Sequence, residues 1–179
     1  MEVDTTVVTK QNLFRSIVGV LLIITLVSCQ SLGFGPSPTR LEVSIEASPN
    51  LNPNAEGRPS PIVFRFYELS SADVFESSDF FTLYDTEMAT LGKFIVFRDE
   101  MNIKPGQLKK FKREAKPETR YIGVIAAYRD LDNARWRGLL EIKPHEKNKI
   151  MIHLGSLSVS ITNLADKHST QRRDEDGDN

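Results

Sequence analysis

Histidine and cysteine, the side chains that most often bind metals or perform catalysis, are scarce in this sequence of 179 residues. It has three histidines, His145, His153 and His168, and a single cysteine, Cys29. The histidines lack the short spacing of a metal-ligand motif, and none has a cysteine partner. His153 falls on the polar phase of an alternating segment, as a solvent-facing side chain would. The sequence therefore predicts no metal site and no cofactor.

The strongest candidate for acid–base chemistry is the charged segment around Asp130 and Asp132. Arg129, Arg135 and Arg137 are close in the sequence, and a carboxylate beside such cations can acquire a shifted pKa. The same composition is typical of a charged turn with surface ion pairs, which performs no chemistry. We favour the turn, and we expect no catalytic residue and no enzymatic activity.

Cys29 is the one residue whose surroundings indicate a specific reaction. Lys10 and Arg15 precede a predominantly apolar run, residues 17–27, and the small Ser28 and then Cys29 follow directly. This order is that of a secretory signal peptide. The run is shorter than the ~20 residues that a membrane-spanning helix needs. We therefore predict a signal peptide over residues 1–28.

The segment Leu26-Val27-Ser28-Cys29 resembles the lipobox of bacterial lipoproteins. The resemblance implies cleavage between Ser28 and Cys29, with a covalent lipid, diacylglyceryl and N-acyl, on Cys29. Gln30 is not the aspartate that typically retains such proteins at the inner membrane, so the resemblance favours the outer membrane. The alternative is a signal peptide or apolar anchor with a chance cysteine. Residues 29–39, rich in glycine and proline, then form a flexible tether between the lipid and the fold.

The composition of the remaining chain indicates one folded domain. Hydrophobic residues make up 40% and charged residues 26%, with a net charge of -1. A near-neutral chain offers no broad basic surface for nucleic acid. The polar segment 163–179 ends in Asp174-Glu175-Asp176-Gly177-Asp178 and buries too little apolar area to fold, so we expect a disordered acidic tail. A calcium loop there is the weaker interpretation, because the flanking helices and the bidentate glutamate are absent from the sequence.

Apolar and polar residues alternate through most of residues 40–162, as half-buried strands require. We expect about eight strands, including 41–47, 62–69, 94–103, 107–112 and 121–128. Turn signals between them, and no strand–helix–strand repeat, predict an all-β fold, a two-sheet antiparallel β-sandwich. Residues 121–128 are apolar on both faces, so their outer face needs a cover. Residues 71–91 have helical spacing and form the expected helical insertion, with Ser71 or Asp79 as caps.

The long connection between the first two predicted strands is the segment that most suggests function. Hairpin loops usually have two to five residues, whereas this one spans residues 47–60 and is stiffened by three prolines. We interpret it as a partner-binding loop, with Leu51 as an apolar anchor for a partner's pocket. A plain solvated loop is the alternative. The predicted contact residues are Ser48, Pro49, Asn50, Leu51, Asn52, Pro53, Asn54, Ala55, Glu56, Gly57, Arg58 and Pro59.

Several segments together resemble the TssJ family, the outer-membrane lipoproteins of type VI secretion systems. They are residues 47–53 (Ala-Ser-Pro-Asn-Leu-Asn-Pro), 57–61 (Gly-Arg-Pro-Ser-Pro), 79–84 (Asp-Phe-Phe-Thr-Leu-Tyr) and 123–130 (Gly-Val-Ile-Ala-Ala-Tyr-Arg-Asp). The resemblance runs from the lipobox to about Thr162 and offers no role for the acidic tail.

The resemblance implies a transthyretin-like β-sandwich, anchored by lipid in the outer membrane and facing the periplasm. It implies a structural adaptor that binds the periplasmic C-terminal region of the inner-membrane subunit TssM, in a complex that also contains TssL. The loop between strands one and two, here Ser48 to Pro59, would make that contact. A periplasmic carrier of a small apolar ligand is the alternative, with Trp136, Tyr121 and Tyr128 lining a cavity. We expect a structural protein without a small-molecule substrate.

The lipid prediction is tested by Cys29→Ser, which removes the thiol that would accept the acyl chains. We expect a folded protein that moves from the membrane to the soluble fraction after cell fractionation, because its membrane affinity comes from those chains. Wild-type protein expressed at the same level is the control. A mutant that still sediments with the outer membrane would contradict the prediction.

Overall fold

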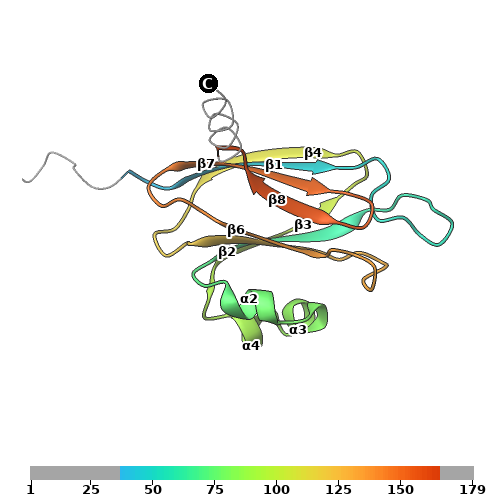
Figure 1. Ribbon diagram of the computed structural model, residues 1–179, viewed down its shortest axis with the longest axis horizontal. Coiled ribbons are helices and arrows are strands. Elements are labelled where there is room, and N and C mark those ends of the chain that lie inside the picture. Colours follow the sequence, from blue (N-terminus) through green and yellow to red (C-terminus); the bar gives the residue numbers. More distant parts are fainter. Residues whose placement is uncertain (1–36, 166–179) are drawn as a thin grey trace, which may run out of the picture. The chain divides into compact units, whose positions relative to one another are not determined.

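The computed structural model describes residues 37–165. Within this range, strands form where the sequence alternates between apolar and polar residues. All eight predicted strands are present (Figure 1). They are β1 (Arg40–Ala47), β2 (Ile62–Leu69), β3 (Ile95–Ile103), β4 (Leu108–Glu114), β5 (Tyr121–Ala126), β6 (Arg137–Glu141), β7 (Lys147–Leu154) and β8 (Val159–Asn163). The predicted signal peptide, Ser28, Cys29 and most of the acidic tail lie outside the described residues. β8 extends one residue past the expected end of the domain.

Two four-stranded sheets form the sandwich, and the predicted fold class is confirmed. Sheet A has the order β4-β1-β7-β8 and sheet B the order β3-β2-β5-β6. One strand pair differs from the prediction, because β1 pairs with β7 in parallel while the other pairs are antiparallel. Parallel neighbours need a long crossover, which the chain between β1 and β7 supplies by forming sheet B and β4. Alternation in a sequence carries no information about strand direction.

The core lies between the sheets and is built by the apolar phase of each strand. Leu41 and Ile45 of β1 are fully buried, as are Phe64 and Phe66 of β2, and Ile152 of β7. Burying a side chain of this size contributes about 1.5–3 kcal/mol relative to leaving it exposed. These strands therefore supply a large part of the driving force for folding.

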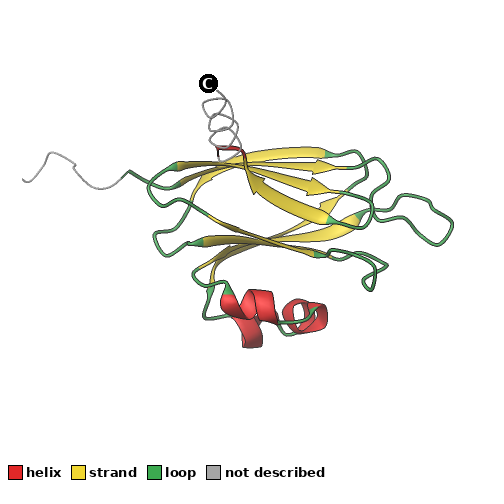
Figure 2. Ribbon diagram, in the orientation of Figure 1, coloured by secondary structure: helices red, strands yellow, loops and turns green. Residues whose placement is uncertain are grey.

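Three short helices cover the outer face of sheet B, as the sequence predicted for residues 71–91 (Figure 2). They are α2 (Asp73–Ser77), α3 (Phe80–Asp85) and α4 (Glu87–Leu91). Asp79 caps α3, because its carboxylate accepts a hydrogen bond from the backbone N–H of Thr82. Ser71 does not cap α2, whose N-cap residue is Ala72. A Cβ on Gly123 of β5 would lie 2.9 Å from the Phe75 ring, so only glycine allows α2 to pack this closely.

A four-residue ionic network fastens the helices to sheet B. Glu87 of α4 accepts from Arg65 of β2 at 3.0 Å and pairs with Arg98 of β3 at 2.8 Å. Glu100 pairs with both arginines. The hydrogen bond from Arg65 lowers the pKa of the Glu100 carboxyl below its ordinary value. Burial raises the pKa of the neighbouring Tyr67 to about 12.

The direction of β1 defines two opposite ends of the sandwich. Residues 37–39 lead into its first residue, and we call this the tether end. Its last residue leads into the long loop, at what we call the loop end. The turns 104–107, 127–136 and 155–158 also lie at the loop end, because they follow β3, β5 and β7 there. Residues 115–120 and 142–146 lie at the tether end.

A buried carboxylate closes the space between the sheets at the tether end. The Glu68 side chain is fully buried, and its Oε1 lies 2.8 Å from Nε of Arg113 in β4. Its Oε2 accepts from the Thr119 hydroxyl at 2.8 Å and from the Lys116 backbone N–H at 3.3 Å. A charge in this position is tolerated only because it is paired and hydrogen-bonded.

Glu68→Ala is therefore expected to lower the free energy of unfolding by about 3–5 kcal/mol, because it leaves Arg113 partly buried without its counter-charge. Urea unfolding followed by circular dichroism measures the loss. Glu118→Ala removes an exposed glutamate from the same end and should change stability by less than about 0.5 kcal/mol. Equal stabilities of the two variants would show that the buried pair is energetically neutral.

Candidate functional site

The predicted partner-binding loop, Ser48 to Pro59, has a fixed base and a projecting tip. The base, residues 48–52 with Ser60, is tied to the neighbouring strands. Ser48 N–H donates to the Leu154 carbonyl at 2.8 Å, and Ser60 N–H donates to the Leu51 carbonyl at 3.0 Å. The tip, residues 53–59, extends beyond the sandwich at the loop end (Figure 1). Its residues 55–59 are exposed. The tip can therefore contact another molecule without any rearrangement of the fold.

Leu51 does not project into solvent, which contradicts the prediction that it anchors a partner. Its relative exposure is 0%, and it belongs to the core between the sheets. A single apolar residue in a polar loop lowers its free energy by turning inward when a core lies directly beneath it. Leu51 anchors the loop to its own sandwich instead of to a partner.

Asn52 joins three separate segments of the loop end. Its N–H donates to the Ser156 carbonyl at 3.0 Å, and its side-chain Nδ2 donates to the Pro61 carbonyl at 3.0 Å. Its Oδ1 accepts from the Arg129 N–H at 2.9 Å. The backbone of Asn52 is left-handed, with φ at 47°, a conformation that asparagine tolerates better than most residues. The residue is 3% exposed, so it organises the surface from beneath.

Asn54 holds the tip in one conformation. Its Oδ1 accepts from the N–H groups of Glu56 and Arg58, at 3.1 and 2.8 Å. The backbone closes the same turn, because Asn54 N–H donates to the Arg58 carbonyl at 2.9 Å. Gly57 allows the reversal with φ at 75°. The exposed Glu56 and Arg58 side chains are thus presented from a structured turn.

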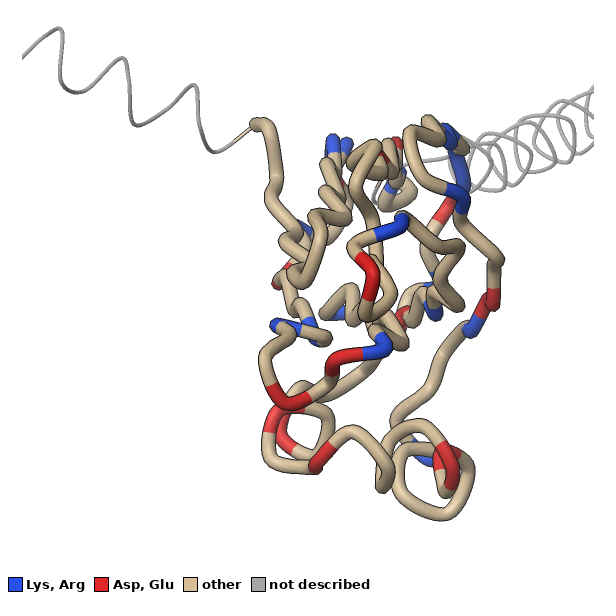
Figure 3. The backbone as a smooth tube through the Cα atoms, turned by 90° about the vertical axis from the view of Figure 1, so that its right-hand side faces the viewer, with Lys and Arg blue, Asp and Glu red and all other residues tan. Residues whose placement is uncertain are grey.

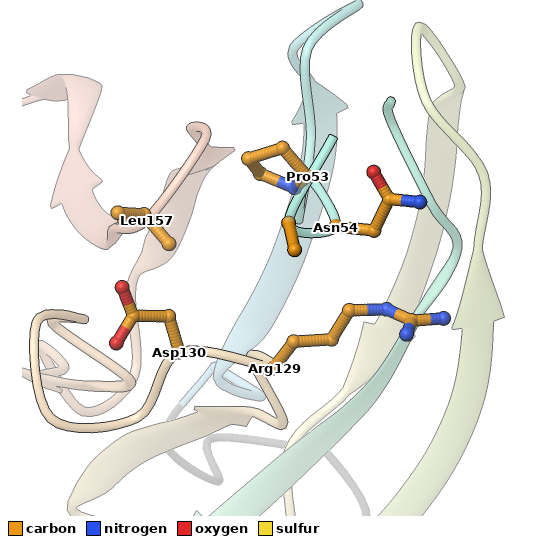
Figure 4. A pocket seen from close by; sticks show the side chains of 6 residues that line it. Pro53, Asn54, Arg129, Asp130 and Leu157 are labelled. Atoms are coloured by element: carbon orange, nitrogen blue, oxygen red, sulfur yellow. The ribbon is translucent and has the colours of Figure 1, made fainter. Parts of the chain in front are cut away.

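A surface hollow of about 480 Å³ lies between the tip and the two neighbouring turns (Figure 4). Pro53, Asn54 and Ala55 form one wall, and the other lining residues are Arg129, Asp130 and Leu157. Asp130 also accepts hydrogen bonds from Asn133, including one from its side-chain Nδ2 at 2.9 Å, so its carboxylate stabilises a turn. The sequence predicts a charged turn for residues 129–133 and gives no indication that they contact the loop. Their position beside the tip depends on pairing between distant strands and has no local signal in the sequence.

Three further hydrogen bonds tie the loop end together. Ala47 N–H donates to the Gln107 carbonyl at 2.9 Å and Gly106 N–H to the Ser48 carbonyl at 3.1 Å. The Tyr128 hydroxyl donates to the Gly155 carbonyl at 3.2 Å, and burial raises the pKa of Tyr128. Hydrogen bonds therefore join the long loop and the turns 104–107, 127–136 and 155–158 into one continuous surface.

Trp136, His145 and His153 lie in surroundings that favour a structural role or a place on the surface over ligand or metal binding. The Trp136 ring meets Phe80 edge to face, with centroids 5.3 Å apart, which favours packing over the lining of a ligand cavity. His145 N–H donates to the Thr39 hydroxyl at the tether end, whereas His153 is exposed on sheet A. Within residues 37–165 no group of three or more histidine, cysteine or carboxylate side chains is placed to hold a metal ion. No helix in that range is long and apolar enough to cross a membrane.

Comparisons with known proteins agree on one family. Residues 39–157 match the family model described as type VI secretion lipoprotein, VasD, EvfM, TssJ. The crystal structure of the type VI secretion lipoprotein TssJ1 from Pseudomonas aeruginosa is similar with a TM-score of 0.68 and 38% identity, covering 70% of this chain and 96% of that chain. Lip from Serratia marcescens, a membrane-bound component of the same kind of system, has a TM-score of 0.64 and 29% identity over 70% of this chain and 96% of its own.

A further solved structure, of the TssM C-terminal domain from EAEC, contains a chain with a TM-score of 0.57 and 21% identity. The match covers 69% of this chain and 97% of that chain, and it supports the fold alone. A comparison with curated proteins found no match.

Asn52→Gly tests the role of the buried amide in ordering the loop. Glycine tolerates the left-handed backbone but removes both side-chain hydrogen bonds, which we expect to cost about 1–3 kcal/mol of stability. The loosened tip should be cleaved faster after Glu56 by the protease Glu-C. Asn50→Gly, in an exposed position of the same loop, is the matched control. Cleavage of both variants at the wild-type rate would mean that Asn52 does not order the tip.

Proposed function

The chain belongs to the type VI secretion lipoprotein family, and we propose that it is a structural adaptor of the secretion system's membrane complex. In this proposal, lipid on Cys29 holds the protein at the outer membrane, facing the periplasm. The loop Ser48 to Pro59 binds the periplasmic C-terminal region of TssM, in a complex that also contains TssL. The protein has no catalytic task, because its contribution is to connect two points in space.

The observation that carries the proposal is the separation of the tether from the loop. Both are attached to β1, at its opposite ends, and an eight-residue strand is about 25 Å long. β1 is hydrogen-bonded on both edges, to β4 and to β7, so it cannot tilt independently of the sheet. A lipid at one end would therefore leave the loop directed away from the membrane.

The order within the loop favours binding by a preformed surface. Leu51 and Asn52 fix its base, and Asn54 fixes its tip. A loop that is already ordered loses little conformational entropy on association, so more of its contact energy appears as affinity. The hollow beside the tip, bounded by Arg129 and Asp130, can accept a side chain from the partner.

The relatives support a membrane-complex role. TssJ1 from Pseudomonas aeruginosa, at 38% identity, is a type VI secretion lipoprotein, and Lip from Serratia marcescens is a membrane-bound component of the system. A chain of similar fold occurs in the structure of the TssM C-terminal domain from EAEC.

The proposal is tested by calorimetric titration of residues 31–179, which retain the whole sandwich, with the periplasmic C-terminal region of the cognate TssM. Glu56→Arg combined with Arg58→Glu exchanges the two tip charges without changing the net charge. We expect this exchange to weaken binding at least about tenfold, because it places like charges where complementary ones were. A variant lacking residues 54–58 should not bind.

Lys116→Glu combined with Glu118→Arg makes the same exchange on exposed residues at the tether end and serves as the control. It should retain wild-type affinity. An absence of binding by the wild type would overturn the adaptor proposal. Equal weakening by both exchanges would place the partner surface elsewhere than on the loop.

A further inference from the structure

The outer face of sheet A carries no covering element within residues 37–165, in contrast to sheet B with its helices (Figure 1). Its exposed side chains are the polar phase of the strands whose apolar phase builds the core. In β1 these are Arg40, Glu42, Ser44 and Glu46, which alternate with buried residues. β4 and β7 present their polar phase on the same face, because they pair with β1 in register.

Basic residues are concentrated on the half of this face nearest the tether. The register aligns Arg40 with Lys147, Glu42 with Lys112 and Lys149, and Ser44 with Lys110. We call the five basic side chains the basic patch, and they are Arg40, Lys110, Lys112, Lys147 and Lys149. The Lys112 and Lys147 side chains are 79% and 52% exposed. The only carboxylates in these rows, among the described residues, are Glu42 and Glu114.

Glu42 lies at the centre of the patch, between two of its lysines. Its Oε1 lies 2.9 Å from the ammonium groups of both Lys112 and Lys147. Hydrogen bonds from these two lysines lower the pKa of Glu42 to about 2. One carboxylate shared by two lysines leaves excess positive charge, and Lys110 and Lys149 beside it are exposed. The half of the face nearest the loop lacks this concentration of lysines, since the row there consists of Glu46, Leu108 and His153.

The opposite side of the sandwich has the opposite charge. The helical insertion exposes Asp73, Glu76, Asp79 and Asp85, and no lysine or arginine occurs between Ser71 and Leu91. Figure 3 shows acidic segments on the helices at the bottom and basic segments among the strands at the top. An anionic surface would therefore attract the basic patch and repel the insertion, which selects one orientation of the domain.

We propose that the basic patch rests on the anionic phospholipid surface of the membrane that holds the lipid anchor, and so sets the tilt of the domain. The inference rests on the proposed lipid at Cys29. From Cys29 to Arg40 the chain can span at most about 40 Å, so the domain stays within reach of that surface. Arg40 is both the first residue of β1 and a member of the patch, which places the basic charge where the tether enters the fold.

The position of the patch determines which end of the domain faces away from the lipid. Attraction acts on the tether half of sheet A, whereas the loop half has little basic charge. The domain is then inclined, with its tether end against the headgroups and the loop Ser48 to Pro59 raised toward the periplasm. Lipid plus a basic surface provides two membrane signals, which together hold a protein more firmly than either one.

The test is sedimentation of residues 31–179, which carry no lipid, with two kinds of vesicle. One kind contains phosphatidylglycerol mixed with phosphatidylcholine, and the other contains phosphatidylcholine alone. We expect binding to the anionic vesicles only, with a loss at high salt because ions screen charges at the surface. Lys110→Glu combined with Lys149→Glu should weaken that binding by about tenfold or more.

Lys93→Glu combined with Lys104→Glu makes the same change in net charge on exposed residues outside the patch, and this control should bind like the wild type. Equal loss in both variants, or equal binding to neutral vesicles, would overturn the proposal. So would binding to soluble polyglutamate with none to anionic vesicles, since that result would assign the patch to an acidic protein segment.

Titration of the same variants with the TssM region separates this inference from the adaptor proposal. The Lys110→Glu, Lys149→Glu variant should keep wild-type affinity for TssM, because the patch lies away from the loop. Patch-dependent vesicle binding without any TssM binding would support the patch and contradict the adaptor. TssM binding, together with vesicle binding that does not depend on the patch, would support the adaptor and contradict the patch.

Discussion

Hydrogen bonding of β1 along both of its edges is the constraint on which the rest of the structure depends. β4 pairs with one edge and β7 with the other, over nearly the whole length of the strand. A central strand of this kind is a rigid spacer, because displacing it would break two ladders at once. The tether end, the basic patch and the loop all take their positions from this one strand.

The loop shows how a long connection becomes ordered without regular secondary structure. Leu51 contributes apolar burial and Asn52 contributes hydrogen bonds to Ser156, Pro61 and Arg129, so the base shares the stability of the core. The tip then needs only the local bonds of Asn54. The buried base supports the loop, whereas the exposed Glu56 and Arg58 at the tip are available to contact a partner.

The two faces of the sandwich also differ in a way that suits an anchored protein. Sheet B is covered by an acidic helical insertion, fastened through Arg65, Glu87 and the residues paired with them. Sheet A leaves its polar phase exposed, with lysines gathered near the tether. A net charge of -1 conceals this separation, because the charges nearly cancel in the sum but not in space.

The sequence by itself determined the eight strands, the helical insertion, the long loop and the lipobox resemblance, because each is a pattern of neighbouring residues. Alternation of apolar and polar side chains reflects the two-residue repeat of a strand, whatever its partner is. Tertiary structure alone decided the parallel pairing of β1 with β7, the inward direction of Leu51, and the meeting of Asn52 with Arg129. It also decided that Lys110 and Lys149, from strands distant in sequence, share one face. These features depend on which strands pair and in which direction, and hydrogen bonds between distant segments leave no local pattern in the sequence.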